Sequence, residues 1–134
     1  QDDKKAFEYY CMAAENGSTG AMNNIGNFYL HGKGVAKDYD KAFAWYQKAA
    51  ELSGNAAAEC SLGMCYQYGY GTKMDYEKAR RFYELSAKQG LGLAYYRMGL
   101  LYEQGLGVAK DIRIAKQYFG EALHRGCREA ALKL

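Results

Sequence analysis

A glycine-rich string recurs along this chain of 134 residues, first at an interval of 37 residues and then of 36. Its copies occupy residues 32–38, 69–75 and 105–111, and each begins with Gly-x-Gly and ends with Asp. A period of this length is typical of repeat proteins, in which each small unit buries its apolar surface only against its neighbours. The period therefore predicts a row of similar, stacked units.

Each unit is predicted to hold two helices, one on either side of the glycine-rich string. Small and apolar residues recur at helical and not at alternating spacing over about residues 19–31, which predicts the first helix. The second helix is predicted to begin after Asp38, because an aspartate carboxylate can accept hydrogen bonds from the free amide groups of a first turn. Asp75 and Asp111 stand at the same place in the later copies.

One glycine lies inside each predicted first helix, at Gly26, Gly63 and Gly99. Glycine costs about 1 kcal/mol relative to alanine in a helix interior, so its repeated use there indicates a packing requirement. We predict that the missing side chain lets the partner helix approach closely. Aromatic pairs such as Trp45 and Tyr46 are predicted to fill the space between neighbouring helices.

The repeat frame divides the chain into a partial unit (1–17), full units at about 18–53, 54–89 and 90–125, and a partial unit (126–134). Asp2 aligns with Asp38, so the chain begins at the second helix of a unit, and its last helix stops before the helix glycine. Solenoids normally end in polar capping units, which neither end resembles. We therefore expect a segment of a longer array with exposed apolar ends. The alternative is a protein whose ends are simply short.

Three motifs carry a family resemblance: Ala-x3-Ile/Leu/Met-Gly-x2-Tyr, then Gly-x-Gly-Val/Thr-x2-Asp, then Ala-x2-aromatic-Tyr/Phe. Together they resemble the Sel1-like repeat, a tetratricopeptide-like class, over essentially the whole chain. The resemblance implies an all-α fold: an α-solenoid of antiparallel helix pairs with 36–37-residue repeats, wound into a right-handed superhelix. The loops depart from the family pattern, since Ala36, Met74 and Ala109 stand near the place of a common proline.

The composition argues against several classes of partner. The net charge of +3 comes from 18 basic and 15 acidic residues spread along the chain, whereas a nucleic-acid binder clusters its cations on one face. No stretch approaches the roughly 20 apolar residues of a membrane-spanning helix. We therefore predict no binding of nucleic acid and no direct insertion into a membrane. The four cysteines favour a reducing compartment such as the cytoplasm, and the localisation stays open.

Several residues invite a catalytic or ligand-site interpretation that their spacing argues against. The Gly-x-Gly strings lack the preceding strand and the third glycine of a dinucleotide site. Cys60 and Cys65 lie about 140° apart around one predicted helix, which disfavours a disulfide, and the four cysteines lack the two close pairs that zinc requires. His31 aligns with Tyr68, about 12 Å along the helix from Cys60, too far for a catalytic dyad. We predict no catalytic residue, metal or cofactor, and no enzymatic activity.

The resemblance places the first helices on the concave face of the superhelix, where tetratricopeptide-like solenoids bind partners. Counted from the helix glycine, the predicted groove positions lie three residues before it and one, four and five residues after it. They hold Asn23, Asn27, Leu30, His31, Cys60, Met64, Gln67, Tyr68, Tyr96, Leu100, Glu103 and Gln104. Amides can pair with an extended peptide backbone, while tyrosine and methionine offer adaptable apolar contact. The alternative is an ordinary solvated helix face.

These observations predict a non-catalytic adaptor or scaffold that binds a protein or peptide partner in the concave groove. Two alternatives stay open. The chain could be the regulatory repeat region of a larger cell-envelope, secretion or enzyme-associated protein. It could also be a solenoid that associates with its own copies through its exposed ends.

Overall fold

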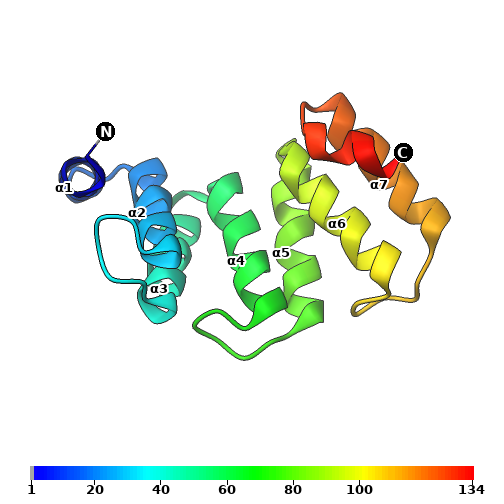
Figure 1. Ribbon diagram of the computed structural model, residues 1–134, viewed down its shortest axis with the longest axis horizontal. Helices are drawn as coiled ribbons and strands as arrows, with labels where there is room; N and C mark the ends of the chain where they lie inside the picture. The colour runs from blue at the N-terminus through cyan, green and yellow to red at the C-terminus, as the bar shows by residue number, and fades with distance from the viewer. Residues whose placement is uncertain (1) are drawn as a thin grey trace.

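The computed structural model describes residues 2–134, which form seven α-helices followed by a 3₁₀ helix (Figure 1). The helices are α1 (Asp3–Glu15), α2 (Thr19–His31), α3 (Tyr39–Ser53), α4 (Ala56–Tyr68), α5 (Tyr76–Lys88), α6 (Gly92–Gln104), α7 (Ile112–His124) and η1 (Arg128–Lys133). They follow one another in a curved row from the N-terminus to the C-terminus (Figure 1). No strand occurs within these residues. This architecture confirms the all-α solenoid of helix pairs.

Each helix packs mainly on its neighbours in sequence. The contacts are most extensive within the pairs α2–α3, α4–α5 and α6–α7, and less extensive between one pair and the next. These pairs are the first and second helices of the predicted units. The first helix α2 also contacts the next first helix, α4, directly.

An aspartate side chain fixes the start of every second helix. Asp38 accepts a hydrogen bond from the backbone N–H of Lys41, with 3.0 Å between Oδ1 and N. The equivalent bonds lead from Lys78 to Asp75 and from Ile114 to Asp111, and Asp2 caps α1 in the same way. Because the first turn of a helix has free N–H groups, such a cap contributes about 1 kcal/mol. The predicted N-caps are confirmed.

The glycine inside each first helix faces a buried aromatic ring of the paired second helix. A Cβ atom on Gly26 would lie 2.5 Å from Cε1 of Tyr46, and one on Gly63 would lie 2.5 Å from Cε1 of Tyr83. Gly99 meets Phe119 in the same way. The three rings are at most 1% exposed. The predicted packing requirement is confirmed, and the group that approaches is an aromatic ring.

The second glycine of each glycine-rich loop joins successive units. Gly34 has a φ of 69°, and a Cβ on it would lie 2.7 Å from the backbone oxygen of Asp3. The loop after α2 thus packs on the start of α1. The corresponding contacts of Gly71 and Gly107 are with Tyr39 and Tyr76, at the starts of α3 and α5. A side chain here would combine an unfavourable left-handed backbone with a steric clash.

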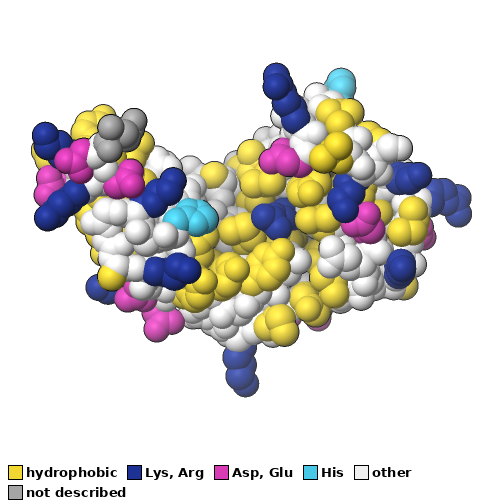
Figure 2. All heavy atoms as spheres, in the orientation of Figure 1, with side chains coloured by type: hydrophobic (Ala, Val, Ile, Leu, Met, Phe, Trp, Pro, Cys, Tyr) yellow, Lys and Arg dark blue, Asp and Glu magenta, His cyan; other side chains and the backbone are white. Residues whose placement is uncertain are grey.

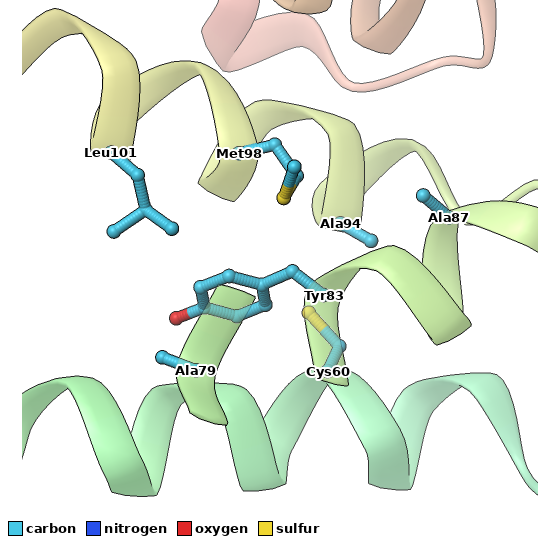
Figure 3. Packing of buried hydrophobic residues seen from close by; sticks show 7 residues of the cluster. All are labelled: Cys60, Ala79, Tyr83, Ala87, Ala94, Met98 and Leu101. Atoms are coloured by element: carbon cyan, nitrogen blue, oxygen red, sulfur yellow. The ribbon is translucent and has the colours of Figure 1, made fainter. Parts of the chain in front are cut away.

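The hydrophobic core consists of clusters that each join neighbouring helices. One cluster joins α4, α5 and α6, and Figure 3 shows its Tyr83 ring facing Met98 and Leu101 of α6. The same ring packs on Gly63 of α4. A single aromatic side chain of a second helix therefore bridges the first helices of two successive units, as expected for a solenoid.

The final segment differs from the first helices with which it aligns. Residues Arg128–Lys133 form a 3₁₀ helix, with hydrogen bonds such as that from Ala130 N to Cys127 O at 3.2 Å. Short terminal turns commonly adopt this tighter geometry. Ala130 is nevertheless buried against α7, so η1 covers α7 in the place of a first helix.

Candidate functional site: the face of the first helices

The predicted groove residues differ widely in exposure. His31, Tyr68 and Gln104 are exposed, and these three occupy the position five residues after the helix glycine. The half-buried residues are Asn27, Met64, Tyr96, Leu100 and Glu103, and the buried ones are Asn23, Leu30, Cys60 and Gln67. The surface that α2, α4 and α6 offer to a partner is therefore narrower than the predicted groove.

Cys60 belongs to the core and not to the partner-accessible surface. Its side chain is 2% exposed and lies in the cluster around Tyr83 (Figure 3). Burial raises the pKa of the Cys60 thiol to about 12, and burial raises that of Cys65 to about 12 as well. Both thiols are therefore neutral and serve as small apolar groups. All four cysteines are free.

Two of the predicted groove amides accept hydrogen bonds from buried tyrosines. The Tyr46 hydroxyl donates a hydrogen bond to Asn27 Oδ1 at 2.5 Å, and the Tyr83 hydroxyl donates one to Gln67 Oε1 at 2.6 Å. Burial raises the pKa of both tyrosines, so both remain donors. These amide oxygens satisfy polar groups of the protein interior.

An open pocket of about 440 Å³ brings predicted and unpredicted residues together. Four of its residues belong to the predicted groove, namely Leu30, His31, Met64 and Tyr68, and four do not, namely Lys37, Tyr39, Tyr70 and Arg97. They come from the ends of α2 and α4, the loops that follow, the start of α3 and the middle of α6. We call this the tyrosine pocket. In Figure 2 hydrophobic side chains gather over α4 and α6, with basic side chains among them.

Three tyrosine rings form one wall of the tyrosine pocket. Tyr39 and Tyr70 stack with 4.4 Å between ring centroids, and Tyr68 stacks on Tyr70 at 5.5 Å. The Lys37 ammonium lies 5.5 Å from the centroid of the Tyr39 ring, within cation–π range. The stacked rings hold one another in place, so the wall is preorganised.

Arg97 adds a second positive charge to the tyrosine pocket, beside that of Lys37. Its Nη1 donates a hydrogen bond of 3.3 Å to the Tyr68 hydroxyl, and its Nε is buried without a hydrogen-bond partner. Within residues 2–134 Arg97 forms no ion pair, and no aspartate or glutamate lines the pocket. The pocket is thus both aromatic and basic.

Sequence reasoning missed Arg97 because the predicted face omitted one helix position. Arg97 lies two residues before Gly99, where the earlier units have Asn24 and Ser61. Positions two before, one after and five after the glycine form a continuous stripe on a helix, so a helical projection could have found it. Lys37 comes from a loop whose return path depends on tertiary contacts, and no sequence signal marks it.

Two further features are absent from the part of the chain that the structure describes. No three His, Cys, Asp or Glu side chains gather closely enough to hold a metal ion there. Among the same residues, no helix combines the length and apolar character needed to cross a bilayer.

The chain is similar to proteins of fungi, plants and bacteria. It is 38% identical over 119 residues to an uncharacterised Sel1-like repeat-containing protein of Schizosaccharomyces pombe, with 89% of this chain and 12% of that protein aligned. It is 38% identical over 115 residues to a component of an ERAD-associated E3 ubiquitin-protein ligase of Arabidopsis thaliana, with 85% and 18% aligned. The chain thus spans less than a fifth of the length of these two curated relatives.

A solved structure and a family description agree with these similarities. The crystal structure of a Sel1 repeat protein from Oxalobacter formigenes matches with a TM-score of 0.85 and 38% identity, over 96% of this chain and 52% of that one. The family model of the Sel1 repeat matches residues 1–18, 19–54, 56–91 and 92–127. The last three matches begin at or next to the first residues of α2, α4 and α6. The chain belongs to the Sel1 repeat family.

Proposed function

We propose that this chain is a non-catalytic interaction module that holds a protein or peptide partner on the face of α2, α4 and α6. Sel1 repeat proteins are generally protein-interaction scaffolds, and their solenoid is typically a non-catalytic module. The observation that carries the proposal is the tyrosine pocket, an open aromatic surface spanning three first helices. Tyr68 is 47% exposed there, and exposed aromatic patches of this kind mark interaction sites.

The accessible part of the face suits an extended segment of a partner. Met64 and Tyr68 lie one turn apart on α4, and Leu100 occupies the position of Met64 on the next first helix. A segment that crosses α2, α4 and α6 would meet one such position on each helix. The stacked tyrosines add contact area that is already ordered, which reduces the entropy lost on binding.

Two broader alternatives stay predictions. The Arabidopsis relative is a component of a ubiquitin ligase, and this chain could likewise be the interaction region of a larger regulatory assembly. Association of the chain with its own copies would use other surfaces than the tyrosine pocket.

A display library of random linear peptides tests the proposed function. The wild-type chain is expected to enrich peptides, and replacement of Met64 and Tyr68 together by alanine should weaken their binding by about tenfold or more, since aromatic anchors dominate such interfaces. The matched control is Tyr9→Ala, which removes a tyrosine that is 67% exposed on the second helix α1. Equal loss in the control and the double variant would place the binding surface elsewhere.

A further inference from the structure

Cationic side chains line the tyrosine pocket, and no carboxylate of the described residues does. The cations are Lys37 and Arg97, and His31 adds an imidazole. We propose that this pocket recognises an acidic segment of a protein partner, whose carboxylate side chain binds Arg97 and Lys37 next to the tyrosine wall. This inference rests on the proposed function.

Arg97 is the first argument for an anionic ligand. Three other arginines, Arg80, Arg81 and Arg125, each pair with a glutamate four residues away along the chain. Arg97 is half-buried, yet within residues 2–134 it forms no ion pair, and its one hydrogen bond goes to a neutral phenol. Its Nε is buried without a partner, as is the Nε of Arg80. A buried guanidinium nitrogen without a partner is unfavourable, and a carboxylate matches the fork of the two terminal nitrogens.

Lys37 and His31 place further donors on the α2 side of the pocket. The chain returns after α2 through a hydrogen bond from Asp38 N to Tyr29 O at 2.9 Å, which fixes the backbone next to Lys37. The pocket lies at the C-terminal ends of α2 and α4, where each helix contributes roughly half an elementary negative charge. Those ends are capped by Gly32 and Gly69. Two full cationic charges on the pocket wall outweigh the capped helix ends.

The tyrosine wall argues for a peptide rather than a small free anion. A free anion would use the cationic groups and leave the wall of stacked tyrosines without a ligand contact. A glutamate or aspartate flanked by aliphatic or aromatic residues would use both, because its neighbours pack on the rings. The pocket volume of about 440 Å³ lies within the usual range of roughly 300–1,000 Å³ for ligand pockets.

Charge complementarity also favours a peptide over a nucleic acid as the ligand of this pocket. Nucleic-acid binders present a stripe of lysine and arginine that follows the phosphate backbone. Here the first helices α2, α4 and α6 carry a single arginine, Arg97, and no lysine. One confined basic pocket fits one or two carboxylates of an otherwise apolar segment.

The decisive experiment scores the charge of the peptides that the chain selects. A display library of random linear peptides is selected on the wild-type chain, and the best peptide is measured by fluorescence anisotropy beside a version with Asp and Glu replaced by Asn and Gln. We expect enrichment of acidic residues, and binding of the neutral version weaker by about tenfold or more. The Arg97→Gln variant should bind the acidic peptide more weakly by a similar factor, and its affinity for the neutral version should be nearly the same as that of the wild-type chain.

A matched control separates local from global electrostatics. Arg113→Gln on α7 makes the same change in net charge outside the pocket and should alter binding by less than about twofold, since exposed charges interact weakly over distance. If Arg97→Gln fails to fold, Arg97→Lys and the salt dependence of wild-type binding replace it. Enriched peptides without acidic bias would overturn this inference and leave the proposed function standing. A library from which nothing is enriched would overturn both.

Discussion

At the scale of the residue, the aromatic side chain on each second helix determines what the facing first helix must carry. Tyr83 is fully buried, so its hydroxyl needs an acceptor, which Gln67 provides. In the last full unit Phe119 has no hydroxyl, and Glu103, at the place of Gln67, instead forms an ion pair with Lys133 at 3.1 Å. The residues predicted to bind a peptide backbone thus have a structural role wherever the second helix carries tyrosine.

This dependence can be measured with a double-mutant cycle on Tyr83 and Gln67. Gln67→Leu should lower the free energy of unfolding by about 1–3 kcal/mol, because it leaves a buried hydroxyl unpaired. Tyr83→Phe should cost about 1 kcal/mol. The double variant should cost clearly less than the sum, because both polar groups are then removed. Urea unfolding followed by circular dichroism gives the three values, and strict additivity would show that the two side chains are not coupled.

At the scale of the element, local signals predicted the helices well and the pocket poorly. The predicted first helix over residues 19–31 coincides with α2, because a serine cap begins it and Gly32 ends it in a left-handed conformation. The 3₁₀ geometry of η1 could not be predicted, since it depends on how the last residues dock on α7. Tyr39 and Tyr70 stack only because the loop after α4 packs on the start of α3, and no pattern within one repeat encodes that contact.

The helix glycines offer a test of packing against helix propensity. Gly63→Ala should gain up to about 1 kcal/mol in helix propensity. Its Cβ would, however, lie 2.5 Å from the Tyr83 ring, and overpacking of this kind typically costs about 1–3 kcal/mol. We therefore expect a net loss in the free energy of unfolding, measured by urea titration.

The control for this prediction lies in the same protein. Gly120 stands inside α7, and a Cβ built on it meets no atom within 4 Å. Gly120→Ala should therefore raise stability by up to about 1 kcal/mol through propensity alone. If Gly63→Ala stabilised the chain as much as Gly120→Ala, the contact with Tyr83 would not be the reason for the glycine.

At the scale of the whole molecule, two neighbouring core clusters each contain a buried tyrosine hydroxyl and a buried cysteine thiol. Tyr46 and Cys65 lie in one cluster, and Tyr83 and Cys60 lie in the next. Burial raises the pKa of all four groups. The two clusters cover the middle units, so ionisation of these groups would disrupt the solenoid at its centre.

These shifts predict a loss of stability in alkaline solution. Below about pH 9 the four groups are protonated in both the folded and the unfolded chain, so they add no pH dependence. Above the ordinary thiol pKa of 9.0 the unfolded chain releases protons that the folded chain keeps, since burial raises the pKa of Cys60 and Cys65 to about 12. The free energy of unfolding should then fall with rising pH, by up to about 1.4 kcal/mol per pH unit for each such group. Urea titrations at a series of pH values measure the slope. In the Cys65→Ala variant the slope of the unfolding free energy against pH should be smaller by the contribution of one group. An unchanged slope would show that Cys65 ionises as readily in the folded chain as in the unfolded one.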